Sequence, residues 1–496
     1  MIFSIDDQTK REKTALLGEA GQSVTYGELC DAVLTFAGQL PPRGLGFLLC
    51  RNTPEAVIGY LGALESGNVP LLLDANLEES IFKALFLTYR PAWIWMPLER
   101  KRGEELPGRA VYGLDSYGLF QTGQQPCVLH PSLALLLATS GSTGSPKLVR
   151  LSRKNIESNA KAIAAYLQIQ PFDRPVTSLP MQYTYGLSII HSHLLMGSCI
   201  LLTTKSVVQK EFWDFLEAQG ATSLSGVPYT YRILDRLKFC QRKPGTLQVL
   251  TQAGGRLPEN LQRKFGTWAQ ENGVRFYVMY GQTEATARMS YLPPQRCLDK
   301  IGSIGIPIPG GKFWIRDAED FTKGSAGELG YEGENIAAAA TGAALCKPGE
   351  LVYEGENVTL GYALKQEDLR KGDEREGVLF TGDLACRDTE GYYYIVGRKS
   401  RFVKLFGMRV SLDACEKLLS KQYPNCESAC IGEDDRLCIY VTDLEVAKEC
   451  RSYLADILHV SPRVLHSYYL EELPKNDAGK VQYAALKVFE QEKEIG

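Results

Sequence analysis

One polar stretch, directly after an apolar run, constrains this chain more than any other feature. Residues 133–138 are apolar and predict a buried strand, and nine residues rich in glycine and hydroxyl side chains follow. Glycines allow backbone N–H groups to turn toward an anion, hydroxyls add donors, and a lysine adds a point charge. Ordinary turns share much of this composition, but two glycines, five hydroxyls and a lysine within nine positions favour a polyphosphate loop. The residues expected to bind phosphate are Thr139, Ser140, Gly141, Ser142, Thr143, Gly144 and Lys147.

The loop does not have the spacing of a Walker P-loop. In that motif the lysine directly follows the last glycine, and Ser or Thr comes next. Here two residues separate Gly144 from Lys147, and a leucine follows the lysine. The sequence T-S-G-S-T-G-S-P-K instead resembles the phosphate loop of the adenylate-forming superfamily. That superfamily includes acyl- and aryl-CoA synthetases, peptide-synthetase adenylation domains and luciferases.

Composition limits the classes of protein to consider. A chain of 496 residues predicts two to four compact units, and a net charge of −3 gives no reason to expect nucleic acid as a partner. No apolar run approaches the roughly 18 residues of a membrane span, and the N-terminus lacks the order of a secretory signal, so we expect a cytoplasmic protein. Thirteen cysteines without a C-x-x-C pair are expected to be reduced thiols, and five dispersed histidines do not predict a metal cluster.

A second motif follows the loop in the order that the superfamily has. The aromatic and β-branched run 276–280 predicts a strand, and open α/β sheets bind ligands where such strands end. The sequence Y-G-Q-T-E at this end resembles the family's Y-G-x-T-E motif. The resemblance implies that the tyrosine stacks on adenine, the threonine contacts the α-phosphate and the glutamate holds Mg²⁺. The implied ATP-binding residues are Tyr280, Gly281, Gln282, Thr283 and Glu284.

Two further segments are expected around the nucleotide. Residues 249–257 predict a strand that enters a double-glycine turn, and the resemblance implies that Gly254 and Gly255 border adenine and the acyl group. A T-G-D sequence and a later G-R pair imply that Asp383 and Arg398 hold the ribose, because a carboxylate can accept from both ribose hydroxyls. An isolated T-G-D is more often only a turn, so this assignment depends on the order of the motifs.

The resemblance places one wall of an acyl pocket within residues 179–197. Tyr183, Thr184 and Gly186 are the residues expected to line it. Relatives that activate α-amino acids have Asp at about position 184, and an ammonium group buried without a carboxylate is strongly disfavoured. The threonine therefore argues against an ordinary α-amino acid substrate. We expect His191 and His193 in the same segment to be packed rather than ligands.

The C-terminal region carries the cation expected to act in catalysis. The sequence P-K-N-D-A-G-K at 474–480 resembles the family's terminal P-K-x-x-x-G-K motif, which implies that Lys480 bridges the acyl carboxylate and the α-phosphate. A lysine in such a loop is otherwise most often solvated. Residues 398–409 resemble the family's hinge, with Ser400 at the position where relatives usually have Asp or Lys.

The implied fold class is α/β. We expect a large N-terminal domain over residues 1–398, with a small β-subdomain near 300–398, and a mobile α+β lid domain over 399–496. The sequence G-E-L-x-Y-E-G-E-N is present twice, at 327–336 and at 349–358. The second copy matches the family best, and the first is expected to add a loop or strand to the β-subdomain.

Together the motifs predict a carboxylate–thiol ligase that uses ATP and Mg²⁺. Such an enzyme forms an acyl-adenylate with release of pyrophosphate and then an acyl thioester, either on CoA or on the phosphopantetheine of a carrier protein. An amino- or hydroxy-acid ligase specific for a carrier protein stays open as an alternative. A catalytically silent nucleotide-binding scaffold is the second alternative, although Thr283, Glu284 and Lys480 are all present.

Overall fold

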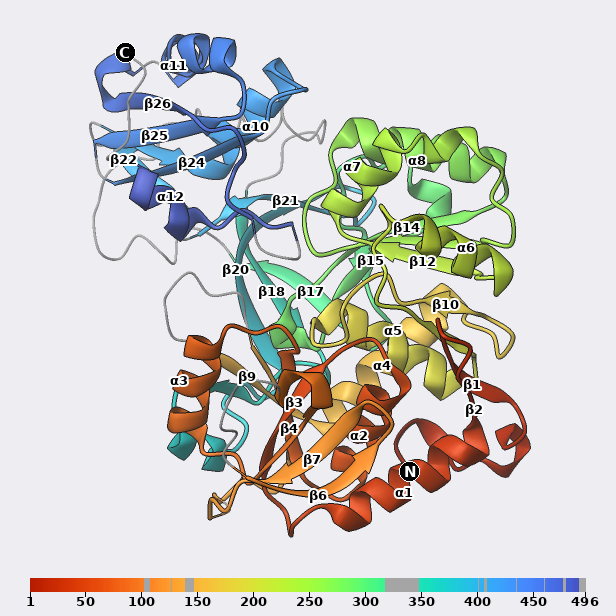
Figure 1. The fold of residues 1–496 in the computed structure, drawn as a ribbon. Helices are drawn as coiled ribbons and strands as arrows, with labels where there is room; N and C mark the ends of the chain where they lie inside the picture. The colour runs from red at the N-terminus through yellow and green to blue at the C-terminus, as the bar shows by residue number, and fades with distance from the viewer. Residues whose placement is uncertain are drawn as a thin grey trace.

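The computed structural model describes residues 1–101, 108–125, 127–138, 147–316, 348–399, 401–405, 408–433, 435–458, 460–475 and 479–489. Helices and strands alternate along most of the chain, and the predicted α/β class is confirmed. In Figure 1 the N-terminal part lies below and the blue C-terminal part lies above, and a sheet formed by β17, β18, β20 and β21 runs between them.

An eight-stranded sheet forms the lower part of the molecule. Its centre, β8-β4-β3-β5, is parallel, and every residue of β3 is buried, as expected of a strand covered on both faces. Helices α1 (Tyr26–Gln39) and α2 (Pro54–Glu65) pack on one face, and α3 (Glu79–Tyr89) packs on the other. In sheet order the strands are β19 (Gly361–Ala363), β9 (Leu148–Ser152), β8 (Leu133–Ala138), β4 (Val69–Asp74), β3 (Leu45–Cys50), β5 (Trp93–Pro97), β7 (Tyr117–Gln121) and β6 (Arg109–Leu114).

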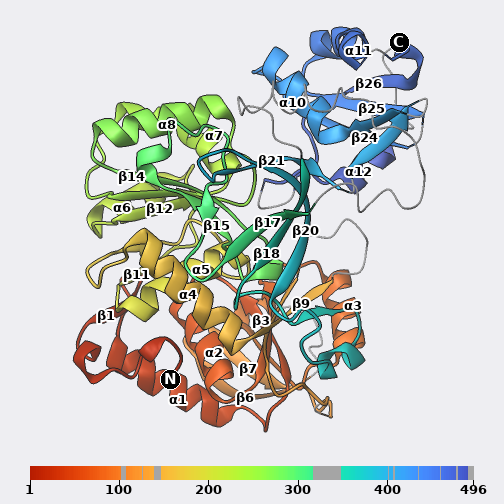
Figure 2. The same ribbon diagram turned by 180° about the vertical axis from the view of Figure 1, so that it is seen from behind.

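A nine-stranded sheet lies beside the first, and its central strands are parallel. Helices α4 (Arg153–Leu167) and α5 (Thr184–Met196) contribute side chains to the cores of both sheets and so lie between them (Figures 1 and 2). The outer face is covered by α6 (Lys210–Ala218), α7 (Pro228–Arg236) and α8 (Glu259–Glu271). In sheet order the strands are β16 (Ile306–Pro307), β15 (Ser290–Leu292), β14 (Arg275–Tyr280), β13 (Val249–Gln252), β12 (Ser223–Gly226), β10 (Pro175–Val176), β11 (Ile200–Leu202), β1 (Thr14–Gly18) and β2 (Ser23–Thr25).

The third sheet is antiparallel and contains the second copy of the repeat. That copy forms β18 (Gly349–Glu354) and the turn after it, while the first copy lies outside the described residues. The partners of β18 are β17 (Lys312–Arg316) and β20 (Val378–Arg387), and β21 (Tyr393–Arg398) pairs with β20. This sheet carries the T-G-D segment toward the end of β14.

The C-terminal part is a separate α+β unit. Strands β24 (Ser428–Glu433), β25 (Arg436–Val441) and β26 (Leu465–Tyr469) form a three-stranded sheet. One core packs this sheet with α10 (Leu412–Gln422), α11 (Leu444–Leu458) and the hairpin of β22 (Phe402–Leu405) and β23 (Met408–Ser411). A second core packs it with α12 (Tyr483–Phe489). The proposed domain boundary at 398/399 falls between β21 and β22.

Side-chain caps mark the starts of two helices. The Ser152 side chain accepts a hydrogen bond from the N–H of Asn155 at the start of α4, and the asparagine side chain accepts one in return. Asp443 accepts from the N–H groups of Glu445 and Val446 at the start of α11. Each cap satisfies N–H groups that have no partner within the helix, which explains why the helices begin here.

The prediction for the cysteines is only partly correct. Eleven cysteines among the described residues are free thiols. Cys386 is disulfide-bonded, so the expectation that all thiols are reduced is wrong there. Sequence spacing gave no sign of this bond, because a disulfide depends on how close two side chains come in space.

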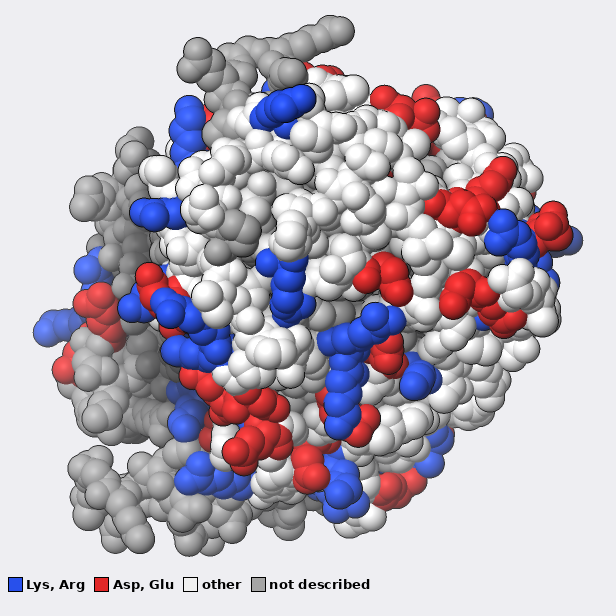
Figure 3. Space-filling model, turned by 90° about the horizontal axis from the view of Figure 1, so that it is seen from below, with Lys and Arg blue, Asp and Glu red and all other residues white. Residues whose placement is uncertain are grey.

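On the face seen in Figure 3, lysines and arginines are interspersed with acidic side chains around areas that carry neither. Among the helices that are described, none is both long and apolar enough to span a membrane.

Candidate active site

The Y-G-Q-T-E motif lies where β14 ends, as predicted. Tyr280 is the last residue of the strand, and residues 283–285 form one short 3₁₀ turn. A Cβ on Gly281 would lie 1.7 Å from the carbonyl oxygen of Ala287, so only glycine fits this bend. The bend therefore aims Thr283 and Glu284 away from the strand.

Four of the predicted nucleotide residues meet at one carboxylate. Asp383 on β20 is paired in register with Arg398 on β21, and the arginine Nε lies 3.2 Å from Asp383 Oδ1. The Tyr280 hydroxyl donates to Asp383 Oδ2 at 2.5 Å, and Gln282 Nε2 donates to the same oxygen at 3.1 Å. Burial, and next the Asp383 charge, hold the pKa of Tyr280 well above its usual value. Segments separated by about a hundred residues are thus joined before any ligand binds.

Tyr362, for which the sequence predicted no role, links two residues of the predicted phosphate site. The hydroxyl of Tyr362 on β19 donates to Glu284 Oε1 at 2.7 Å, and Lys147 Nζ lies 4.0 Å from the centre of the tyrosine ring. Burial, followed by the nearby Glu284 carboxylate, raises the pKa of Tyr362, so the phenol stays protonated and donates. The signal in the sequence was the Gly361-Tyr362 pair, which follows shortly after the second copy of the repeat.

The Glu284 carboxylate is a suitable donor for Mg²⁺. Its oxygens are hard ligands, and the side chain is neither fully buried nor committed to an ion pair among the described residues. Magnesium is commonly held by one or two protein carboxylates together with substrate phosphates. The predicted metal ligand therefore fits the ion without further protein groups.

The predicted acyl-pocket residues lie at the start of α5. Thr184 Oγ1 donates to Thr283 Oγ1 at 3.0 Å, which ties this helix to the nucleotide motif. The Tyr183 hydroxyl covers Gly254, where an added Cβ would lie 2.5 Å from it. Gly186 packs against the backbone of Pro180, since a Cβ would come within 2.2 Å of that carbonyl oxygen.

The two histidines of α5 are packed, as predicted. Both are at most 5% exposed. His191 Nε2 shares a hydrogen bond of 2.8 Å with the Tyr60 hydroxyl, and His193 Nδ1 lies 2.8 Å from the carbonyl oxygen of Ile189. Burial lowers the pKa of His191 to about 3 and that of His193 to about 4, so both imidazoles are neutral near pH 7.

Lys480 reaches the same site from the C-terminal unit. Its Nζ lies 6.0 Å from the centre of the Tyr183 ring. Although the side chain retains access to solvent, surrounding protein lowers the pKa of Lys480, and the Arg398 charge lowers it further. The Glu284 and Asp383 carboxylates act in the opposite direction. The charges of Glu284, expected at the metal, and of Asp383, expected at the ribose, therefore both act on the pKa of Lys480.

A few contacts hold the Lys480 loop against the large domain. Gly479 has φ +70° and lies so close to Tyr229 that a Cβ would come within 2.5 Å of the tyrosine Cβ. Glu427 forms ion pairs with Arg232 on α7 and, at 2.5 Å, with Lys475 in the loop. These contacts link α7 to the end of the chain.

Several predicted site residues lie outside the part of the chain that the structure describes. The phosphate-loop residues Thr139, Ser140, Gly141, Ser142, Thr143 and Gly144 lie outside the described residues. The predicted hinge, Ser400, also lies outside them. Of the loop, Lys147 is described, and it lies beside Tyr362 and not far from Glu284.

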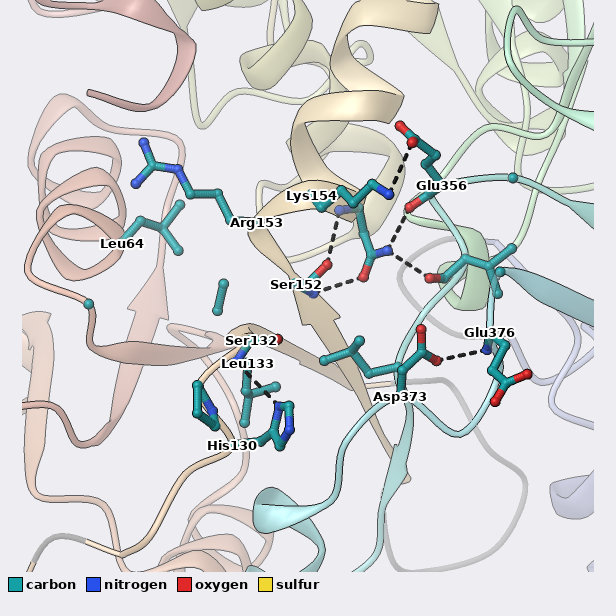
Figure 4. Close-up of a pocket in the computed structure, with 18 of the residues that line it drawn as sticks. Leu64, His130, Ser132, Leu133, Ser152, Arg153, Lys154, Glu356, Asp373 and Glu376 are labelled. Carbon is teal, nitrogen blue, oxygen red and sulfur yellow. Dashed lines mark hydrogen bonds and ion pairs between the residues drawn. The ribbon is translucent and has the colours of Figure 1, made fainter.

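A cavity of about 780 Å³ lies elsewhere in the large domain. In Figure 4 its walls include Ser152 and Lys154 at the start of α4, and Glu356, which pairs with Lys154 at 3.0 Å. The opposite wall includes Asp373, which accepts from the N–H of Glu376. None of the predicted site residues lines this cavity, so we do not assign the chemistry to it.

Comparisons with known proteins show what this chain is similar to. Residues 4–339 match a family described as AMP-binding enzyme. A 2-succinylbenzoate–CoA ligase of Bacillus pumilus is 27% identical over 367 residues, which cover 71% of this chain and 68% of that protein. A ligase of the same name from Bacillus licheniformis is 25% identical over 494 residues, which cover 93% of this chain and 94% of that protein.

A solved structure extends the likeness to the whole fold. It is an o-succinylbenzoate CoA synthetase from Bacillus subtilis in complex with its acyl-adenylate intermediate, and it has a TM-score of 0.72 and 22% identity. The match covers 97% of this chain and 96% of that one. The resemblance stated from the motifs is confirmed, and the chain belongs to the AMP-binding enzyme family.

Proposed function

We propose that this AMP-binding enzyme is an acid–CoA ligase. In the first step a carboxylate oxygen of the acid attacks the α-phosphorus of ATP, the bond to the bridging oxygen breaks, and pyrophosphate leaves. In the second step the CoA thiol attacks the acyl carbonyl carbon, and AMP leaves as the thioester forms. The observation that carries the proposal is that Lys480, from the C-terminal unit, lies 6.0 Å from the centre of the Tyr183 ring on the large domain, so neither half of the chain forms this site alone.

Lys480 acts in the first step. Negative charge builds on the phosphoryl oxygens as the carboxylate attacks, and a fixed cation stabilises that charge best where water is partly excluded. Surrounding protein, followed by the Arg398 charge, lowers the pKa of Lys480, although the side chain still reaches solvent. Its ammonium group orients the incoming carboxylate toward the α-phosphate.

The nucleotide is held by residues of three segments. Asp383 accepts hydrogen bonds from the ribose hydroxyls, and Arg398 keeps that carboxylate in place. Tyr280 and Gly254 border the adenine. Because Asp383 already binds Tyr280 and Gln282, ATP enters a site that is largely formed.

The phosphates lie on the other side, at Glu284 and Lys147. Glu284 would hold Mg²⁺, which neutralises phosphate charge when it is bound. Tyr362 keeps Glu284 and Lys147 on a common support, since it donates to the first and stacks beneath the second. Lys147 and the loop 139–144 take the β- and γ-phosphates.

The acid enters beside Tyr183 and Thr184. Thr184 is bonded to Thr283 and carries no charge, so an α-ammonium group finds no carboxylate here. The names of the two curated relatives support CoA as the acceptor. Rotation of the C-terminal unit about Ser400 withdraws Lys480 before the thiol attacks, as hinged domains commonly use one site twice.

The test is acid-dependent ATP–pyrophosphate exchange across fatty, aryl, hydroxy and amino acids, followed by thioester assays with CoA and with candidate carrier proteins. We expect exchange with at least one acid that lacks an α-amino group, and thioester on CoA. Thioester on a carrier protein alone would favour the carrier-specific alternative. If ATP binds but no acid supports exchange or AMP release, the chain is a nucleotide-binding scaffold and the proposal is wrong.

A further inference from the structure

Arg288 is a buried cation with neutral partners. It lies four residues after Glu284, just before β15, and is only 1% exposed. Its guanidinium lies over the Tyr185 ring, with Cζ 4.4 Å from the ring centre. One terminal nitrogen donates to the Tyr166 hydroxyl at 3.0 Å, and the other donates to Ser188 Oγ at 3.1 Å. The guanidinium Nε has no hydrogen-bond partner.

A second buried arginine, Arg150, has an anionic partner that Arg288 lacks among the described residues. Arg150 is 0% exposed, and it donates to backbone carbonyl groups and pairs with Glu374 at 2.5 Å. Arg288 contacts hydroxyls, a ring and the Met279 sulfur, and no described carboxylate lies within ion-pair distance of it. Burial of a guanidinium without an anion is strongly unfavourable, so a chain retains one where an anion arrives from outside.

Arg288 lies next to the expected acyl pocket. Lys480 Nζ is 6.0 Å from the Tyr183 ring, the Tyr183 and Tyr185 rings are 6.4 Å apart, and Arg288 covers Tyr185 at 4.4 Å. Of the residues that Arg288 contacts on α5, Tyr185 lies between two predicted pocket residues, and Ser188 lies about one turn beyond Thr184. The positive charge also acts on the pKa of Tyr183 and opposes the effect of burial there. The residues thus connect the reacting end of the pocket with a buried cation.

We propose that the acid substrate carries a second carboxylate, distal to the one that is adenylated, and that Arg288 binds it. This inference rests on the proposed ligase function and specifies its substrate class. A carboxylate offers two acceptor oxygens, which match the planar guanidinium and supply the anion that the protein does not. The same charge repels an ammonium group, which strengthens the exclusion of amino acids at Thr184.

The first test compares paired acids on the natural chain by ATP–pyrophosphate exchange. Each pair has one carbon skeleton: butanoate with succinate, hexanoate with adipate, and the methylbenzoates with the corresponding benzene dicarboxylates. We expect one diacid to exceed its monoacid partner in kcat/KM by about 30-fold or more, the scale of a buried charged pair. Equal or better exchange with the monoacids throughout would overturn this inference while leaving the ligase function intact. Absence of exchange with every acid would count against the ligase itself.

Variants at Arg288 provide the second test. Arg288→Met keeps the side-chain length and removes the charge, so we expect the diacid to monoacid ratio to fall by about 30-fold or more. Arg288→Lys keeps the charge but loses the planar fork, and its ratio should lie between the two. Thermal unfolding of each variant separates substrate effects from folding. An unchanged ratio in a folded Arg288→Met protein would show that Arg288 serves only to pack Tyr185.

Discussion

The two parts of the active site are held in very different ways. On the large domain, Asp383 alone joins Tyr280, Gln282 and Arg398 through bonds of 2.5 to 3.2 Å, and Tyr362 fixes Glu284. On the C-terminal unit, the described contacts of the Lys480 loop with the large domain include the packing of Gly479 on Tyr229, the approach of Lys475 to the same ring and the ion pairs of Glu427. The groups expected to bind the nucleotide are therefore prearranged, whereas the lysine that we propose to act in catalysis is placed by partly exposed contacts of the kind that contribute little stability.

The largest effect is expected from Lys480 itself. Lys480→Met removes the cation at the α-phosphate and should reduce acid-dependent pyrophosphate exchange by about 10²- to 10³-fold. ATP affinity, measured by calorimetry, should change little, because the groups that hold the nucleotide belong to the large domain. The matched control is Lys475→Met in the same loop, for which a few-fold loss is expected. Similar losses in the two variants would show that loop position, and not this ammonium group, matters.

The prearranged part is tested at Asp383. Asp383→Asn weakens the bonds to Tyr280 and Arg398 and the acceptor for ribose, and we expect KM for ATP to rise by about 10- to 100-fold. Asp388→Asn is the control, because Asp388 follows the same strand but pairs with Lys300 at 2.8 Å. A normal KM for ATP in Asp383→Asn would remove the residue from the nucleotide site.

Low pH should reduce the stability of the large domain through its buried histidines. The folded-state pKa values of His191 and His193, about 3 and about 4, lie below the ordinary 6.5, so below pH 6.5 the unfolded chain binds protons first. Stability is complete above pH 6.5 and falls as the pH drops toward 3, by about 1 kcal/mol per histidine at pH 5.5. Urea unfolding at pH 7.5 and 5.5 measures this loss. The variant His191→Gln/His193→Gln should show a smaller dependence, and an identical dependence would rule out the histidines as its cause.

The placement of the Lys480 loop is tested at Gly479. Gly479→Ala forces a Cβ against Tyr229 and a positive φ on alanine, so we expect pyrophosphate exchange to fall by about 3- to 10-fold with ATP affinity unchanged. Gly273→Ala is the control, because φ there is +67° but no atom lies within 4 Å of the added Cβ. Equal losses of exchange in both variants would attribute the effect to backbone strain alone.

The smallest effect is expected at Glu427. Glu427→Gln removes the pairing with Arg232 and Lys475, and since these groups are partly exposed, exchange at low salt should fall by only about 2- to 3-fold. The difference from the natural chain should shrink as ionic strength rises. Glu445→Gln, which breaks a pair within the C-terminal unit, should have no effect on exchange. A loss that is independent of salt would contradict an electrostatic role.

Local sequence predicted much of the fold and the large-domain site. The apolar strand β8 and the strand before Gly281 each depend on neighbours within a few residues, so pattern alone identifies them. The same holds for residue types with a fixed chemistry, such as Glu284 as a hard oxygen donor. Local pattern did not predict the role of Tyr362, because its partners, Glu284 and Lys147, lie 78 and 215 residues earlier in the chain.

The sequence by itself determined the family, the order of its motifs and the residue types expected to bind ATP, since these are recorded in short stretches. Only the tertiary structure decided that Asp383 is shared by Tyr280, Gln282 and Arg398, and that Lys480 reaches the same place. It alone also left Arg288 buried among neutral side chains. Charge, hydrogen bonding and burial act through distance in space, and residues far apart in the sequence acquire those distances only when the chain folds.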